Sequence, residues 1–425
     1  MNKEYIKNII IDQREDISEQ LKNKRIILRN GIKECKKYIK HPNLLLISGL
    51  RRAGKSVFAH LLKEKDKYSF LNFDDERLIQ FTAKDFNNVL ECFYELYRKV
   101  DYILFDEIQN IKGWELFINR LRNRYKVIIT GSNANLLSRE LATHLTGRYL
   151  EFVLFPMSFE EFLRFSSLTI EKDIFYSTQK KSKITQLFHL YIKQSGIFEF
   201  YQFGREFLRK LWSSVITKDI IARYQIKYPH ILEELALILA NSFSSKVSVN
   251  NLSKHLQVKS SHTISEYIKY LENSFLIFTV NKFSYKLKEQ LSSFKKIYIT
   301  DHGFINALSV NFSENKGRLL ENIVAIELKR HCLFRNNEFF YWDNYHFECD
   351  FVIKRRKQIV SLYQVCAELN INNKKREIAG LVGAMKEFGL KKGYILTESQ
   401  EDEIRVNNYK ISIIPLWKWL LKPEV

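Results

Sequence analysis

A glycine-bounded segment of eight residues carries the clearest chemical signal in this sequence. It reads Gly49, Leu50, Arg51, Arg52, Ala53, Gly54, Lys55 and Ser56. An apolar run of strand length precedes it, and apolar residues from Val57 onward recur at helical spacing. In this order of strand, loop and helix, backbone N–H groups of the loop can converge on phosphate oxygens. The segment therefore predicts a site for the phosphates of a nucleotide.

Each part of this loop has a task under that hypothesis. Gly49 and Gly54 permit the backbone path, because glycine adopts conformations that other residues avoid. Lys55 would reach the β and γ phosphates as a point charge, and the Ser56 hydroxyl would be a ligand of Mg²⁺. We expect Gly49 to Val57 to line the nucleotide, with Mg²⁺ bound beside it.

A second strand ends in two adjacent carboxylates. The apolar residues 102–105 lead directly into Asp106 and Glu107, with room for one crossover unit after Lys55. Asp106 would bind Mg²⁺ directly or through water, and Glu107 would act as general base on the attacking water. Two acids after an apolar run more often mark a strand that ends at a solvated edge. The glycine-rich loop upstream favours the catalytic interpretation.

A third strand and a later arginine extend the candidate site. Residues 126–133 form a strand with a polar end, where Ser132 or Asn133 would sense the γ-phosphate if the sheet is parallel. Arg148 is a candidate for stabilising transition-state charge, on its own site or on that of a neighbouring subunit in a homo-oligomer. An ordinary turn and a solvated arginine are the alternatives.

Composition limits the remaining choices. A chain of 425 residues predicts two or three domains. Its apolar runs are too short for a membrane span, and its five cysteines include no CxxC pair, so we expect a cytoplasmic protein without disulfides or zinc. The net charge of +20 suits a polyanion such as DNA, although compositional bias towards lysine explains it equally well.

The motifs resemble a widespread group of prokaryotic ATPases within the AAA+ and related STAND lineages. The matching segments are Gly49–Ser56, Leu104–Gln109, Ile129–Ser132, Leu145–Arg148 and Phe155–Phe162. The last three, in this order, are particular to the group. The resemblance implies ATP as the nucleotide, and it implies an ATPase domain followed by a winged helix and a C-terminal domain that resembles a restriction endonuclease.

Patterning and resemblance together predict an α/β fold in four segments. They are a parallel-sheet P-loop ATPase core with an N-terminal helical part (1–160), a helical lid or connector (161–238), a winged helix (239–310) and an α/β nuclease-like domain (311–425). The boundaries are placed where the spacing of apolar residues changes. The second segment is predicted to be helical because little proline or glycine interrupts its apolar residues at spacings of three and four.

The third segment is the candidate DNA-binding module. Residues 247–280 indicate helix, turn, helix and strand, an order that can place the second helix in the major groove of double-stranded DNA. Ser261, His262, Thr263 and Lys269 would then meet phosphates or bases, but only Lys269 is a fixed cation. A surface for a protein partner is the alternative.

The fourth segment holds part of a metal-dependent nuclease pattern. Glu321 in a helix and Asp350 in a strand match the PD-(D/E)XK arrangement, but Gln364 and Cys366 stand where that pattern has Glu and Lys. An amide is a poor ligand for a hard cation, and a thiol cannot replace an ammonium group. Glu368 would be a substitute ligand, yet nothing in the sequence offers the lysine. The sequence favours a silent nuclease-like fold used for binding.

These features predict an ATPase whose nucleotide cycle drives a conformational switch that acts on DNA or on a partner protein. An ATP-gated nuclease and a slow, nucleotide-switched interaction scaffold are the alternatives.

Overall fold

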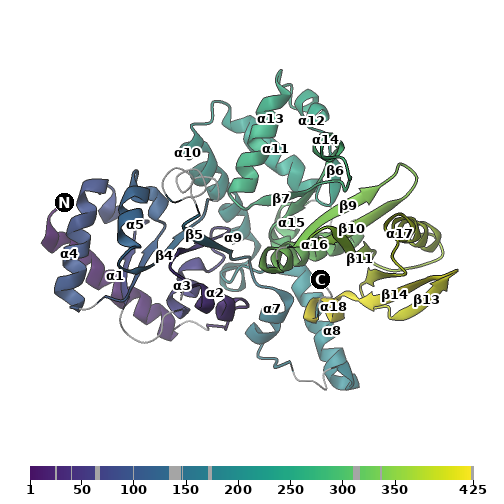
Figure 1. Ribbon diagram of the computed structural model, residues 1–425, viewed down its shortest axis with the longest axis horizontal. Helices are drawn as coiled ribbons and strands as arrows, with labels where there is room; N and C mark the ends of the chain where they lie inside the picture. Colours follow the sequence, from purple (N-terminus) through teal and green to yellow (C-terminus); the bar gives the residue numbers. More distant parts are fainter. Residues whose placement is uncertain are drawn as a thin grey trace. The chain divides into compact units, whose positions relative to one another are not determined.

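The computed structural model describes residues 1–23, 26–39, 41–62, 68–98, 100–133, 145, 147–170, 175–309, 316–335 and 337–422. The chain packs as two compact units (Figure 1). The first unit comprises Met1–Phe155 with Asn273–Phe275, and the second comprises Pro156–Glu272 with Leu276–Val425.

A five-stranded parallel sheet forms the centre of the first unit. Its strands are β1 (Leu44–Ser48), β2 (Tyr68–Asn72), β3 (Tyr102–Asp106), β4 (Lys126–Gly131) and β5 (Tyr149–Val153), in the order β2-β3-β4-β1-β5. β1 is buried along its whole length, as expected for a parallel strand that is covered on both faces. Because β4 lies between β1 and β3, the carboxyl ends of the three strands that carry the predicted chemistry are adjacent.

Helices and short turns surround this sheet. They are α1 (Lys3–Asn23), α2 (Ile32–Ile39), α3 (Lys55–Leu61), α4 (Phe86–Tyr97) and α5 (Trp114–Leu121), with 3₁₀ turns η1 (Glu76–Leu78), η2 (Ala83–Asp85) and η3 (Ile108–Asn110). Gln13 of α1 donates to Asn72 O at 3.0 Å and accepts from Asn72 N at 2.8 Å. These bonds protect the end of the edge strand β2, whose backbone groups would otherwise be free to pair with another chain.

The second unit begins with helices. They are α7 (Phe159–Phe165), α8 (Thr178–Lys193), α9 (Phe200–Ser214), the π-helical η5 (Val215–Ile221), α10 (Ala222–Tyr224), α11 (Pro229–Asn241) and, further along the chain, α15 (His302–Leu308). Asp301 joins two distant parts of this layer. It caps α15 through Gly303 N, and it accepts from Ser195 Oγ at 2.7 Å and from Gly196 N at 2.8 Å.

A small antiparallel sheet with three helices follows α11. Its elements in chain order are β6 (Ser245–Val247), α12 (Val249–His255), α13 (Ser261–Asn273), β7 (Ile277–Val280), α14 (Leu287–Ser292) and β8 (Lys295–Ile299). The strand order is β6-β8-β7, and both pairings are antiparallel.

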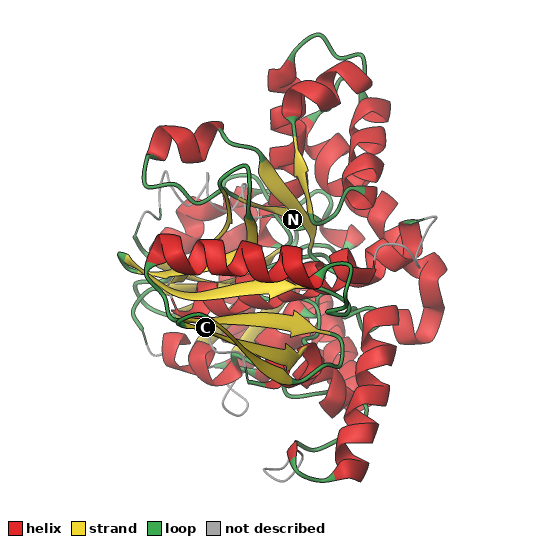
Figure 2. Cartoon of the chain, turned by 90° about the vertical axis from the view of Figure 1, so that its right-hand side faces the viewer, coloured by secondary structure: helices red, strands yellow, loops and turns green. Residues whose placement is uncertain are grey.

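The C-terminal part is a six-stranded mixed sheet with helices on both faces (Figure 2). Its elements are α16 (Lys316–Arg335), β9 (Asn337–Asp343), β10 (Glu348–Arg355), β11 (Gln358–Val365), α17 (Lys374–Phe388), β12 (Lys392–Thr397), β13 (Asp402–Val406), β14 (Tyr409–Pro415) and α18 (Leu416–Leu421), and the strand order is β13-β14-β12-β11-β10-β9. Leu362 packs in the same cluster as Leu381 of α17, whereas its neighbour Tyr363 contacts Trp419 of α18. Since successive side chains of a strand point to opposite faces, α17 and α18 cover opposite sides of the sheet.

The predicted fold class is confirmed: a parallel α/β sheet is followed by a helical segment and a mixed-sheet domain. Among helices of the described ranges, none has the length and apolar character needed to cross a membrane.

Candidate functional site

The loop between β1 and α3 follows a path that requires glycine. Gly49 has a φ of +142° and Gly54 a φ of +90°. A Cβ on Gly49 would lie 2.2 Å from Leu154 O, which is far inside van der Waals contact. The loop therefore lies against the end of β5, and its two glycines have the conformational role that the sequence predicts.

A buried arginine holds this loop in place. No pattern in the sequence pointed to this residue. Arg29 is 5% exposed, and its guanidinium donates to Ala53 O at 2.9 Å and to Phe155 O at 2.6 Å. The partners are carbonyls 24 and 126 residues away along the chain. Only the folded chain brings them together, so no spacing rule could have found this contact.

Five of the predicted site residues meet at the carboxyl end of the parallel sheet. They are Lys55, Ser56, Asp106, Glu107 and Ser132. Lys55 Nζ lies 3.6 Å from Glu107 Oε1, and the Ser56 hydroxyl hydrogen-bonds to Asp106. Ser132 Oγ donates to Glu107 Oε2 at 3.1 Å. Asn133 is buried at the same strand end, and the chain from 134 to 144 lies outside the described residues.

Two polar residues outside the predicted set position the carboxylates. Thr130 Oγ1 donates to Asp106 Oδ1 and accepts from Glu107 N at 3.2 Å. Gln109 Nε2 donates to Glu107 Oε2 at 2.5 Å. Glu107 itself has a φ of +50°, a left-handed conformation that costs free energy in a residue other than glycine. The neighbouring strand and turn therefore hold Glu107 in place. Thr130 was detectable, since it lies two residues before Ser132 in the same polar strand end.

The two adjacent carboxyl groups titrate differently. Burial and the neighbouring Glu107 raise the pKa of Asp106 to about 6, although hydrogen bonds from Ser56 and Thr130 oppose the rise. Burial also acts to raise the pKa of Glu107, but the cations Lys55 and Arg51 outweigh it and lower the pKa below its usual value. Glu107 is therefore the carboxylate that stays ionised.

Arg148 is not brought to the phosphate loop of its own chain. Its backbone oxygen accepts from Leu44 N at 3.2 Å, so Arg148 lies beside the start of β1, whereas the loop follows the end of that strand. A strand of five residues is about 15 Å long. Arg148 Nη1 donates instead to Asn119 Oδ1 at 3.1 Å. This position does not support a role on the chain's own nucleotide, and action on a neighbouring subunit stays a prediction.

The sheet and the loop agree with comparisons to known proteins. Residues 41–163, which include the parallel sheet of the first unit, match the family model of an AAA domain. Residues 199–315 and 316–419 match two domains of unknown function, DUF8612 and DUF4143. In the second unit, therefore, the matching families carry no established role.

The chain belongs to the same family as an uncharacterized protein of Methanocaldococcus jannaschii. The two are 35% identical over 400 residues, which cover 89% of each chain. An uncharacterized protein of Haemophilus influenzae is 32% identical over 304 residues, which cover 67% of this chain and 74% of that protein. Among solved structures, the Walker-type ATPase PABY2304 of Pyrococcus abyssi is 16% identical with a TM-score of 0.41, over 67% of this chain and 96% of that one.

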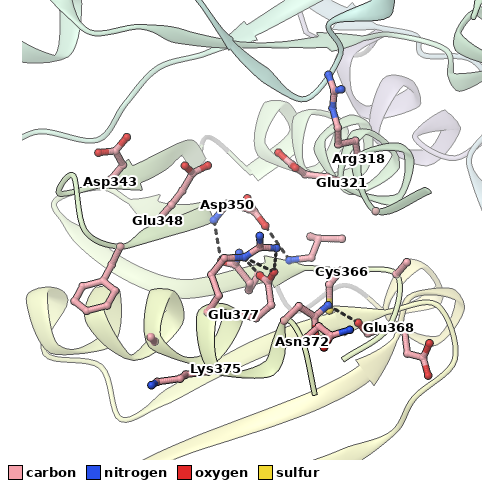
Figure 3. Close-up of a pocket in the computed structure, with 18 of the residues that line it drawn as sticks. Arg318, Glu321, Asp343, Glu348, Asp350, Cys366, Glu368, Asn372, Lys375 and Glu377 are labelled. Carbon is pink, nitrogen blue, oxygen red and sulfur yellow. Dashed lines mark hydrogen bonds and ion pairs between the residues drawn. The ribbon is translucent and has the colours of Figure 1, made fainter. Parts of the chain in front are cut away.

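The three predicted nuclease-like residues line one cavity of about 1230 Å³ in the second unit. Figure 3 shows Glu321 reaching in from α16 and Asp350 from β10, with Glu348 and Asp343 along one side and Glu377 of α17 below. The topology brings these side chains together, although they come from separate helices and strands.

The lysine that the sequence did not offer comes from β8. Lys296 Nζ lies 3.0 Å from Glu321 Oε1, 3.0 Å from Asp350 Oδ1 and 2.8 Å from Glu348 Oε1, and its side chain is 4% exposed. The expectation that no lysine is available was therefore wrong. The nuclease pattern has its lysine at position 366, whereas Lys296 lies on a different strand, 54 residues upstream of Asp350.

The ion pairs with Lys296 compensate the buried acids of the cavity. Burial raises the pKa of Glu321 to about 7, and Lys296 opposes that rise. Gln364 uses both ends of its amide, since Nε2 donates to Glu377 Oε2 at 2.8 Å and Oε1 accepts from Asp350 N at 3.3 Å. A glutamate at 364 could not donate to Glu377. Across the described part of the chain, no group of three or more His, Cys, Asp or Glu residues is arranged to hold a metal.

We predict that Lys296→Ala lowers the free energy of unfolding by about 3–5 kcal/mol, because it leaves buried carboxylates without their cation. The exposed neighbour on the same strand provides the control, and Lys295→Ala should change stability by less than about 0.5 kcal/mol. Urea denaturation of both variants measures the difference. Equal stability of the two variants would show that Lys296 carries no structural charge compensation.

Proposed function

We propose that the first unit binds ATP with Mg²⁺ at the loop Gly49–Ser56 and hydrolyses it. The observation that carries this proposal is the meeting of Lys55, Ser56, Asp106 and Glu107 at one end of the sheet. Backbone N–H groups and the Lys55 ammonium would bind the phosphates.

The donor set beside the loop fits Mg²⁺. Ser56 and Asp106 are hard oxygen donors that already contact each other, and Thr130 orients the Asp106 carboxylate. Ser56 and Asp106 would hold the ion, which would supply positive charge opposite the charge that develops on the phosphates. Ser132 and Asn133 would contact the γ-phosphate. Arg148 would stabilise transition-state charge at the nucleotide of a neighbouring subunit.

The contact between Lys55 and Glu107 suggests how substrate binding prepares the base. The Lys55 ammonium lies against Glu107 and contributes to the low pKa of that carboxyl group. When Lys55 turns to the phosphates of ATP, Glu107 loses this stabilising cation and its proton affinity rises. Gln109 and Ser132 hold the carboxylate in place during this change. Glu107 thus becomes a better general base once ATP is bound.

We further propose that residues 245–299 act as a winged helix and that the nucleotide cycle drives a switch that acts on DNA or a partner protein. The order of strands and helices and the antiparallel pairing β6-β8-β7 support this assignment. For the C-terminal domain we propose a nuclease-like fold without cleavage activity, supported by Gln364 and by the ion pairs of Lys296.

We expect Glu107→Gln to lower ATP turnover about 10²- to 10⁴-fold while ATP still binds, because the amide preserves the shape of the side chain but cannot accept the proton of water. Lys55→Ala should instead weaken ATP binding itself. Phosphate release and nucleotide affinity measure the two effects separately.

The exposed acid Glu34 on α2 supplies a matched control, and Glu34→Gln should behave as the unchanged protein. Undiminished turnover in Glu107→Gln would remove the assigned base. Affinity for ATP that survives Lys55→Ala would contradict the assigned phosphate site.

The raised pKa of Asp106 predicts a pH dependence of Mg²⁺ binding. The pKa of this carboxyl is raised to about 6, so it is mostly ionised at pH 7 and mostly protonated at pH 5. Since a proton competes with Mg²⁺ for the carboxylate, the half-saturating Mg²⁺ concentration for ATP turnover should rise about tenfold between pH 7 and pH 5.

Asp106→Asn removes this group and retains the titration of the nucleotide, so it is the control in the same Mg²⁺ titrations. An equal pH dependence in both proteins would mean that Asp106 is not the group that competes with Mg²⁺.

A further inference from the structure

One end of the mixed sheet in the second unit carries a row of exposed cations. The tight β10–β11 turn pairs Arg355 with Gln358, and Lys392 pairs with Lys410 where β12 and β14 begin. Because β11, β12 and β14 are parallel, these positions lie at one edge. The exposed cations there are Arg355, Arg356, Lys357, Lys391, Lys392 and Arg405.

Two acids at this edge are already engaged by other lysines. Glu338 lies 2.7 Å from Lys354, and Glu403 lies 2.6 Å from Lys410. The edge thus carries positive charge, whereas the cavity at Asp350, near the other end of β10, is lined by carboxylates. Six exposed cations therefore lie along this edge of the sheet.

The segment between β7 and β8 lies against the same domain. Phe283 N donates to Tyr341 O at 2.7 Å, and the Phe283 ring lies 5.0 Å from the ring of Phe388 in α17. This segment exposes Tyr285 (77%) and Leu287 (67%) together with two lysines, Lys286 and Lys288.

A cavity of about 580 Å³ joins the segment to the row of cations. Tyr285, Leu287 and Gln290 line it from the β7–β8 segment, and Lys354, Lys357 and Gln358 line it from the β10–β11 turn. Apolar, amide and cationic side chains thus share one surface, which we call the basic edge.

We propose that the basic edge, and not α13, binds the phosphate backbone of a nucleic acid. The row crosses the five strands from β10 to β13 and spans about 19 Å, enough for about six base pairs of duplex. Evenly spaced phosphates suit such a row of lysine and arginine side chains, because both bind phosphate oxygens. On the exposed face of α13, Lys269 is accompanied by Glu266, so the predicted recognition helix offers little net charge.

This inference deepens the proposed function by naming its target and the surface that meets it. Binding is measured without nucleotide and turnover without DNA, so the failure of either proposal is visible separately. The test variant is Lys288→Ala/Arg356→Ala/Lys357→Ala, and the control is Lys33→Ala/Lys36→Ala/Lys37→Ala, which removes three exposed lysines of α2. All six side chains are exposed, so both variants should unfold like the parent protein.

Fluorescence anisotropy with a 30-base-pair duplex over 50–200 mM NaCl measures affinity and its salt dependence. We expect the test variant to bind at least tenfold more weakly and the salt slope to fall by about 3, one for each lost phosphate contact. The control should keep the parent slope. A single strand of equal length distinguishes a preference for single-stranded nucleic acid from one for duplex.

Three results would overturn the proposal. The first is that the parent protein binds neither nucleic acid. The second is that the test and control variants lose the same amount of nucleic-acid affinity. The third is that His262→Ala/Lys269→Ala on α13 lowers the affinity while the test variant does not. Binding of poly-glutamate but not of nucleic acid would assign the surface to an acidic protein instead.

Discussion

A lysine ammonium held against buried or partly exposed carboxylates is the interaction on which both charge clusters of this protein depend. Lys55 lies beside Glu107 in the first unit, and Lys296 lies among Glu321, Glu348 and Asp350 in the second. A buried carboxylate without such a partner would be costly, because the interior solvates charge poorly. Each group of carboxylates is therefore stabilised by a lysine that comes from another helix or strand.

The two lysines differ in how they are held. Lys55 follows a glycine loop and begins the short helix α3, and its partner Glu107 has further partners in Gln109 and Ser132. Phosphate can replace Glu107 as the counterion of Lys55 without leaving Glu107 unsupported. Lys296 instead projects from the middle of a paired strand and touches three acids at once. The arrangement around Lys55 suits an exchange of its counterion, whereas the arrangement around Lys296 suits permanent neutralisation of the three acids.

The second unit separates charge along its mixed sheet. Carboxylates gather in the cavity at Asp350, and cations gather at the basic edge beyond Arg355, at the other end of the same strand β10. Because the paired strands and the helices on both faces hold the sheet together, this separation is a fixed property of the domain. Under the functions proposed above, this separation would let the domain contact a polyanion at one edge without using its acidic cavity for cleavage.

Local sequence determined the parts of this protein whose chemistry lies within one short segment. The glycine loop, the strand that ends at Asp106 and Glu107, and the helical periodicity of 159–238 are all local signals, and the structure has a loop, a strand and helices there. The parallel order of the sheet follows because strands alternate with helices along the chain.

Tertiary structure alone decided which distant residues support these segments. Arg29 reaches carbonyls 24 and 126 residues away, Lys296 compensates acids of a later domain, and Arg148 lies at the start of β1, away from the loop that follows the end of this strand. Such contacts depend on strand order and on the approach of separate elements, which no spacing along the chain encodes. The sequence therefore indicated which residues the candidate nucleotide site contains. The fold decided which lysines neutralise the carboxylates of that site and of the second unit.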